Sequence, residues 1–302
     1  MPAMLTASGE RVRVATLLGH AQVPMAVRCL SSLLRLSAER LSLAIHDDGT
    51  LGESDRERLR AALRDPEFIA RAEADARVEA LLDRHPRTLR FRQENPLALK
   101  LIDGPLLEPG PVYRYCDSDV LFLRPFWGLF EMPADLDAVF MADSQNAYAL
   151  RSWQLLGDRR LRLAGRVNTG LIVFRRQMFD LDRIEHVLAR VRPGFAAVWL
   201  EQTCWAALAG PIRTALFHPR QIAFPRAQRE RGAPVALHFI SPLRSGWESW
   251  CDGESDEVLP RDPLEIGRQR GHQCGPVGLA RSEARRWLRG RACSWRARLW
   301  RP

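Results

Sequence analysis

The opening of the chain constrains its fold more than any other segment, because it predicts a strand, a helix and a second strand in close succession. The apolar stretch Val12–Leu18 is closed by Gly19, and apolar side chains then recur at helical spacing over residues 25–36. A second apolar stretch, 41–45, ends at His46-Asp47-Asp48-Gly49. Two strands joined through a helix lie parallel in one sheet with a right-handed crossover, so the sequence predicts an α/β fold.

Composition agrees with a globular α/β protein. The chain has 302 residues, of which 46% are apolar and 27% are charged. No apolar run reaches the roughly 18–20 residues that span a bilayer, and residues 1–14 lack the apolar core of a signal peptide. We therefore expect a cytoplasmic protein. The six cysteines are scattered without a CxxC pair, so we expect no disulfide framework, with Cys116 and Cys204 in the core.

The later elements follow from the same patterns. Short apolar runs bounded by Gly, Pro or Asp predict strands, and Pro or Ser-Asp before a helical pattern predicts the start of a helix. The expected strands are 88–92, 112–116, 120–123, 138–142, 171–174 and 235–240. The expected helices begin at Ser54-Asp55 and cover 66–84, 96–107, 181–191 and 201–209.

Positive charge is concentrated at the end of the chain. The net charge is +9, and residues 261–302 hold eleven arginines against three acidic residues, a net of +8. We therefore expect one folded domain over residues 1–260 and a basic tail, rich in Arg and Trp, over residues 261–302.

The expected tail also has a helical pattern. Its apolar positions are spaced as on one face of a helix, with arginines around them: Ala284, Trp287, Leu288, Ala292, Trp295 and Leu299. Tryptophan together with arginine favours the surface of an anionic membrane, so residues 281–301 are a candidate for peripheral attachment at the inner face of the membrane. A disordered tail and a helix packed on the core are the alternatives.

The densest signal is Asp117-Ser118-Asp119. Carboxylates at i and i+2 of a regular strand point to opposite faces, so they converge on one ion only where the strand ends and the chain bends. The preceding run Val112–Cys116 is mostly apolar, which indicates a buried strand. Open α/β sheets bind ligands at the carboxyl ends of such strands. Carboxylate oxygens suit Mg²⁺ or Mn²⁺, which commonly bridge to phosphate oxygens.

Four stretches together carry a resemblance to a known family. They are Tyr115-Cys116-Asp117-Ser118-Asp119-Val120, then residues 167–174 with Asn168-Thr169-Gly170, then Glu201-Gln202-Thr203, and last Leu237-His238-Phe239 with Arg244 and Trp247. In this order they resemble the metal-dependent glycosyltransferases of the GT-A fold. The sequence is most similar to the family-eight retaining enzymes, the group of glycogenin and the lipopolysaccharide galactosyl- and glucosyltransferases. The resemblance covers roughly residues 10–250.

The resemblance implies a fold and an activity. The fold is GT-A, a single Rossmann-like, mostly parallel sheet flanked by helices. The activity is metal-dependent, retaining transfer of a hexose from a nucleoside-diphosphate sugar, expected to be a UDP-sugar, to a glycan, lipid-linked or small acceptor. The expected partners are therefore the nucleotide sugar and this acceptor, and no nucleic acid.

The resemblance also implies the site residues. The expected ligands of Mn²⁺ or Mg²⁺ are Asp117, Asp119 and His238. The donor is expected to contact Lys100 and Arg244 with its diphosphate, Ser118 with its ribose, Thr16, His20 and Asp48 with its nucleotide, and Asn168 and Gly170 with its sugar. The catalytic set is Asp143, Glu201 and Gln202, with Gln202 beneath the anomeric carbon. The family's Lys-Pro-Trp after the histidine is replaced here by a segment with Arg244 and Gly246-Trp247.

Several of these side chains also have a purely structural interpretation. The alternatives are a solvated helix face for Lys100, the only lysine of the chain, a core position for His238, turns for Asp48, Asn168 and Gly170, and the first turn of a helix for Glu201 and Gln202.

Three other functions use similar features. A phosphatase of the haloacid dehalogenase type also has an Asp-x-Asp after a strand, but on its first strand and with Thr or Val where Leu121 stands. A nucleotidyltransferase shares the fold and the metal, but needs a Gly-rich basic loop after the first strand, where Leu18-Gly19-His20-Ala21-Gln22 stands. Nucleic-acid binding through the Arg tail is the non-enzymatic alternative, with the basic residues confined to that tail.

Overall fold

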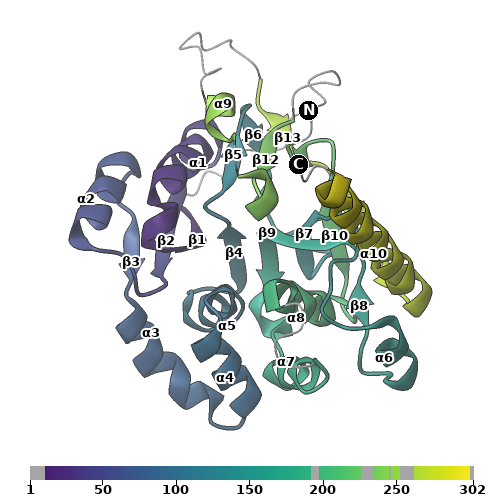
Figure 1. The fold of residues 1–302 in the computed structure, drawn as a ribbon. Helices are drawn as coiled ribbons and strands as arrows, with labels where there is room; N and C mark the ends of the chain where they lie inside the picture. Colours follow the sequence, from purple (N-terminus) through teal and green to yellow (C-terminus); the bar gives the residue numbers. More distant parts are fainter. Residues whose placement is uncertain (1–10, 192–196, 226–233, 245, 252–261, 300–302) are drawn as a thin grey trace.

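The computed structural model describes residues 11–191, 197–225, 234–244, 246–251 and 262–299, and the other residues are drawn as a thin grey trace in Figure 1. Its centre is one mixed sheet of eight strands. In spatial order they are β14 (Arg268–Arg270), β10 (Thr214–Phe217), β7 (Ala138–Ala142), β9 (Val167–Arg175), β4 (Val112–Cys116), β1 (Val12–Leu18), β2 (Leu41–Asp47) and β3 (Glu67–Ile69).

The first strands confirm the predicted parallel arrangement. Helix α1 (Val23–Leu36) connects β1 to β2, and these strands pair along their whole length, with Val12 opposite Leu41 and Leu18 opposite Asp47. Strand β4 joins the other side of β1, also in parallel. Strand β9 then runs antiparallel between β4 and β7. The carboxyl end of β4 and the beginning of β9 therefore meet at the same edge of the sheet.

Alternate residues of β4 supply the two faces of the sheet, as the period of a strand requires. Tyr113 and Tyr115 pack in one hydrophobic cluster, and Val112 and Cys116 pack in the other. The first cluster includes helices α5 (Leu97–Leu107) and α8 (Leu200–Ala209), and the second includes α1. Trp205 of α8 is fully buried and stacks on Tyr113 with ring centroids 6.0 Å apart.

A small second sheet continues from the acidic motif. Its strands are β11 (Ile222–Ala223), β12 (Ala236–His238) and β5 (Val120–Phe122). Strand β5 follows directly after Asp117-Ser118-Asp119, and β12 pairs with it in antiparallel fashion so that His238 lies opposite Val120. This register brings a histidine from the last third of the chain beside the two carboxylates.

The remaining helices lie around the large sheet (Figure 1). They are α2 (Glu53–Ala62), α3 (Arg71–Val78), α4 (Pro86–Glu94), α6 (Ser152–Gly157), α7 (Leu181–Leu188), α9 (Glu248–Cys251) and α10 (Pro276–Leu299). Among the described residues, no helix combines the length and the apolarity that crossing a membrane requires.

Two sequence predictions were wrong in the segment after β2. Residues 88–92 form part of helix α4 instead of a strand, because Pro86 stands in the first turn and is suited to open a helix. One face of this helix is buried and carries Thr88 and Phe91. Arg92 is buried on the same helix, where it forms an ion pair with Asp103. Residues 66–84 form strand β3 and then α3 instead of one helix.

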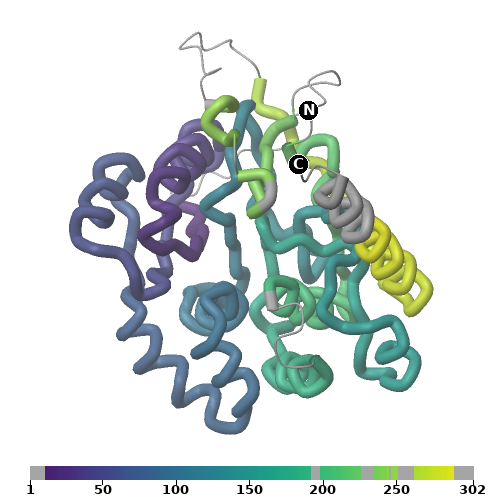
Figure 2. Tube along the Cα trace, viewed as in Figure 1, coloured from purple at the N-terminus to yellow at the C-terminus, as the bar shows by residue number. Residues whose placement is uncertain are grey.

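The segment after Pro260 differs from the expected basic tail. Strand β14 pairs with β10 at the edge of the large sheet, and β15 (Gln273–Cys274) pairs with β8 (Leu163–Ala164). Ile266 and Leu279 are fully buried. In Figure 2 the first turns of α10, in yellow, lie beside the teal segment that contains α6. These strands are short and carry Arg and Gln at an exposed sheet edge, so their composition resembles that of a tail.

We predict that Ile266→Ala lowers the free energy of unfolding by about 2–5 kcal/mol, because truncation of a fully buried side chain leaves a cavity. Val277→Ala is the matched control, since that side chain is 65% exposed and should change the stability by less than about 0.5 kcal/mol. Urea unfolding of both variants measures the difference. Equal unfolding midpoints would show that residue 266 belongs to a tail.

Candidate functional site

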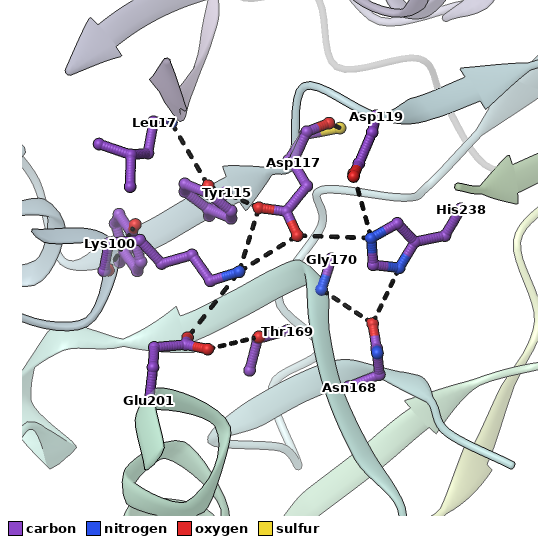
Figure 3. A network of polar contacts seen from close by, with 12 residues as sticks. Leu17, Lys100, Tyr115, Asp117, Asp119, Asn168, Thr169, Gly170, Glu201 and His238 are labelled. Atoms are coloured by element: carbon purple, nitrogen blue, oxygen red, sulfur yellow. Dashed lines mark hydrogen bonds and ion pairs between the residues drawn. The ribbon is translucent and has the colours of Figure 1, made fainter. Parts of the chain in front are cut away.

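The two carboxylates of the acidic motif converge because β4 ends at Cys116. The N–H of Asp117 donates to the carbonyl of Gly170 at 2.8 Å, and the N–H of Val120 donates back to the carbonyl of Asp117 at 3.3 Å. The chain thus turns between β4 and β5, which removes the alternation that would separate the side chains. Asp117, Asp119 and His238 each offer one ligand atom, and these atoms lie within 4.8 Å of one another. Figure 3 shows the three side chains pointing toward one another.

His238 is oriented by Asn168. The Nδ1 atom of His238 lies 3.1 Å from the side-chain oxygen of Asn168, which also accepts the N–H of Gly170 at 3.0 Å. Because this oxygen is an acceptor, the Nδ1 atom of the ring carries a hydrogen. The opposite Nε2 atom lies 3.1 Å from Oδ1 of Asp119 and 3.5 Å from Oδ2 of Asp117. A histidine held through its other nitrogen in this way is typical of metal ligands.

These residues fit a divalent cation. Oδ1 of Asp119 is buried and accepts no hydrogen bond, although Nε2 of His238 lies nearby. Burial lowers the pKa of His238, but the charges of Asp119 and Asp117 outweigh this effect and raise the pKa to about 9. Two carboxylate oxygens and one imidazole nitrogen suit Mn²⁺, and the oxygens also suit Mg²⁺.

Gly170 allows the histidine to approach. A Cβ atom on Gly170 would lie 2.5 Å from Cε1 and Nδ1 of His238, closer than real Cβ contacts allow. The Asn168-Thr169-Gly170 segment therefore does more than turn the chain. Asn168 orients the imidazole, and Gly170 leaves room for it.

Lys100 is buried at 5% exposure, so the structure contradicts the alternative that places it on a solvated helix face. Its Nζ atom donates to both oxygens of Asp117, at 3.0 and 3.1 Å. Burial lowers the pKa of Lys100, but the charge of Asp117 raises it above its ordinary value. Conversely, burial raises the pKa of Asp117, and Lys100 and His238 lower it below its usual range. The hydroxyl of Tyr115 also donates to Asp117 at 2.7 Å.

Glu201 lies on the other side of Lys100. One of its oxygens is 3.9 Å from Nζ of Lys100, and the other accepts the hydroxyl of Thr169 at 2.9 Å. Burial raises the pKa of Glu201 to about 7, although the charge of Lys100 lowers it. Glu201 thus stands at the boundary between its neutral and charged forms near neutral pH.

Gln202 and Asp143 form a second group. The side-chain amide of Gln202 donates to the carbonyl of Ala147 at 3.0 Å and to Oδ2 of Asp143 at 3.4 Å. Burial raises the pKa of Asp143, although the N–H of Gln145 and the side chain of Asn168 lower it. Asn168 acts on the pKa of Asp143 and bonds His238, so it connects this group to the acidic motif.

Arg244 neutralises Asp119 from the solvent side. Its Nη2 and Nε atoms lie 2.7 and 3.1 Å from Oδ2 of Asp119. The side chain of Arg244 is 43% exposed, so it remains accessible to a ligand. Ser118, between the two carboxylates in the chain, is 8% exposed.

The three expected nucleotide residues lie on β1 or directly after β1 and β2. Thr16 is fully buried on β1, and its hydroxyl has no hydrogen bond within the described part of the chain. The ring of His20 contacts Asp55 at 2.8 Å, and Asp48 accepts two hydrogen bonds from Thr50. The N–H of His20 donates to the hydroxyl of Thr50 at 2.9 Å, which joins the two loops to each other. The loops adjoin the acidic motif through β1, because the N–H of Leu17 donates to the hydroxyl of Tyr115 at 3.3 Å.

Sequence reasoning missed several contributors. The motifs include Tyr115 and Thr169 without assigning either a role. No motif includes Phe224, although its ring stacks on His238 with centroids 5.8 Å apart. Tyr115 sits two residues before Asp117, which places its hydroxyl on the same side of β4. That spacing was a usable signal. Phe224 is brought in by the β11–β12 pair, which leaves no local mark in the sequence.

Comparison with solved structures identifies the fold. Mouse xyloside xylosyltransferase 1, in its apo form, has a TM-score of 0.51 at 11% identity, over 77% of this chain and 99% of that one. The galactosyltransferase LgtC, in complex with donor and acceptor sugar analogs, has a TM-score of 0.51 at 13% identity, over 76% of this chain and 88% of that one. The bifunctional glycosyltransferase WbbM has a TM-score of 0.50 at 11% identity, over 79% of this chain and 47% of that one.

At these identities the likeness concerns the fold alone. No protein-family model matches the sequence, and no curated protein matches it. The chain has the GT-A fold of these glycosyltransferases, as the motifs predicted.

We predict that Asp119→Asn weakens Mn²⁺ binding by more than about tenfold, because losing a ligand costs at least as much as losing a group that orients one. The substitution keeps the shape of the side chain and removes its charge. Asp135→Asn is the control, since Asp135 is exposed and outside this site. Calorimetric titration with MnCl₂ measures both affinities. If the Asp119 variant binds Mn²⁺ as tightly as the unmodified protein, the acidic motif is not the metal site.

Proposed function

We propose that this chain is a metal-dependent glycosyltransferase that moves a hexose from a nucleoside-diphosphate sugar, a UDP-sugar, to a glycan, lipid-linked or small acceptor. The observation that carries the proposal is the convergence of Asp117, Asp119 and His238 at the carboxyl end of β4, within a GT-A fold. The neighbour LgtC was solved with donor and acceptor sugar analogs, which supports a sugar-transfer function for this arrangement.

Asp117, Asp119 and His238 would hold Mn²⁺ or Mg²⁺, and the metal would supply positive charge to the leaving diphosphate. Fixed charges stabilise a transition state best where its charge develops. Arg244 is the accessible cation beside this point, and it already contacts Asp119. Lys100, buried under Asp117, holds that carboxylate in place. The loops with His20 and Asp48, together with Thr16 on β1, are proposed to receive the nucleotide, with Ser118 at its ribose.

The sugar end of the donor is assigned to the second group. Asn168, Asp143 and Glu201 offer hydrogen-bonding groups for sugar hydroxyls. Gly170, which has no side chain, is proposed to leave space for the sugar beside them. The Gln202 amide is held by Ala147 and Asp143. An amide is a poor nucleophile, so Gln202 is proposed to stabilise positive charge at the anomeric carbon. This role accompanies retention of the anomeric configuration.

A donor screen tests the proposal directly. Thermal unfolding should be measured with UDP-glucose, UDP-galactose and the corresponding GDP-sugars, each with and without Mn²⁺. We expect one sugar nucleotide to raise the unfolding temperature only when the metal is present, and Asp119→Asn to abolish the rise. Stabilisation that is equal with excess chelator would contradict a metal-dependent donor site.

We predict that Gln202→Ala lowers turnover more than about tenfold while the donor KM stays within about twofold, because the amide acts mainly in the transition state. Gln177→Ala is the matched control, since its side chain is exposed. Steady-state kinetics and NMR of the anomeric proton of the product give the two measurements. An inverted product would make Glu201 or Asp143 a general base instead.

We also propose that the protein is cytoplasmic and attaches peripherally to an anionic membrane through residues 281–301. Trp287 and Leu288 on α10 are each 59% exposed, which supports an apolar contact there. The side chains of Ala292, Trp295 and Leu299 lie outside the described residues. Each arginine near an anionic surface contributes about 1 kcal/mol.

Sedimentation with anionic liposomes tests the attachment. We predict that the full chain pellets with phosphatidylglycerol vesicles at low salt and is released at high salt, because the attraction is electrostatic. The paired substitution Trp287→Ala with Leu288→Ala should reduce pelleting, whereas Val198→Ala, an exposed apolar residue outside α10, should not. Equal pelleting of all three proteins would exclude α10 as the attachment site.

A further inference from the structure

Asn146 has all four of its polar groups bonded although it is buried at 8% exposure. Its backbone N–H donates to the hydroxyl of Ser282 at 3.2 Å, and its side-chain amide donates to the carbonyl of Gly278 at 3.3 Å. Its backbone carbonyl accepts a guanidinium N–H of Arg286 at 2.6 Å, and its side-chain oxygen accepts the N–H of Arg166 at 2.8 Å. Three of the four partners belong to α10.

The loop that contains Asn146 also holds the second group of the site. Asp143 lies three residues before it, and the carbonyl of Ala147, directly after it, accepts the side-chain amide of Gln202 at 3.0 Å. Two residues further, the N–H of Ala149 donates to the hydroxyl of Thr203 at 2.8 Å. The position of this loop therefore fixes the position of the Gln202 amide.

Helix α10 contacts the beginning of α8 as well. The guanidinium of Arg286 lies 4.9 Å from the ring centroid of Trp199, which is the N-cap residue of α8. One arginine thus bonds the loop on one side and covers the start of the helix that carries Gln202 on the other. The contact of Glu283 with Ser152, at 2.9 Å, fixes the same helix to the start of α6.

Arg166 completes the arrangement from the opposite side. It has a φ of 58°, an uncommon conformation for a residue other than glycine. Its N–H reaches Asn146, and its Nε atom donates to the carbonyl of Asp143 at 2.7 Å. The loop is therefore held between a strained turn and α10.

We propose that Asn146 is a positioning residue that couples the first three turns of α10 to Gln202, so that residues 276–286 take part in sugar transfer without touching the reacting atoms. The inference rests on the proposed function for its effect on turnover. Its structural part, the transmission of order from α10 to the loop, stands on the hydrogen bonds alone.

Ser282→Ala and Asn146→Ala test the coupling, with Arg285→Ala, an exposed neighbour on the same helix, as the control. Ser282→Ala removes one hydroxyl from α10 and leaves the loop sequence intact. We expect amide hydrogen exchange at Ala149 and Arg166 to become at least about tenfold faster in both variants, and to stay unchanged in the control. Unchanged exchange in Ser282→Ala would overturn the proposed coupling.

The kinetic part uses UDP with Mn²⁺ for affinity and a UDP-sugar for turnover. We expect UDP affinity to stay within about twofold and turnover to fall about tenfold or more. In the double variant Asn146→Ala with Gln202→Ala, the two effects should not add, because residues that act as a unit are not additive. If the effects of the two substitutions on turnover add fully, Asn146 does not act through Gln202 and its role is structural only. Failure of the unmodified protein to bind UDP with Mn²⁺ would contradict the proposed function, whereas the exchange comparison would still decide the coupling.

Discussion

The electrostatics of three close carboxylates is the constraint on which the rest of the site depends. Asp117, Asp119 and Glu201 converge in a region of low solvent access, where like charges repel strongly and each charge loses its hydration. Three basic side chains lie against these carboxylates: Lys100 from α5, Arg244 from the segment after β12, and His238 from β12 itself. Each of these side chains comes from a different segment. The carboxylates at the end of β4 are therefore neutralised only when all of these segments pack around β4.

This dependence explains what the sequence revealed and what it concealed. The acidic motif was predictable because its position after an apolar strand is a local pattern, and the same holds for β1, α1 and β2. Asn168 and Gly170 were recognised from their neighbours in the chain, but the reason for the glycine, its close approach to His238, depends on a contact across the fold. The sequence does not determine whether Lys100 is buried or exposed, for the same reason. A helix pattern shows which residues share a face but not which face the rest of the protein covers.

The errors have a common physical origin. The strand predicted at residues 88–92 lies within helix α4, because a run of five residues is too short to distinguish the period of a strand from that of a helix. The residues after Pro260 resemble a tail in composition because edge strands and a surface helix carry as much arginine as a disordered segment. Ile266 and Leu279 show that a few buried side chains suffice to attach such a segment to the core. Asn146 left no sequence signal, since two of its four partners are backbone groups and three belong to α10, far along the chain.

The pairing of β12 with β5 has a consequence for how the protein folds. Asp117 and Asp119 are placed by local turns and by β9, but His238 reaches them only after a long connection closes. Closing such a loop costs entropy before any contact is made, so non-local strand pairs form slowly. During synthesis from the N-terminus, the two acids with Lys100 would exist before the histidine does. Until β12 docks, the nascent site offers oxygen ligands alone, and its preference among cations is set only when the imidazole arrives.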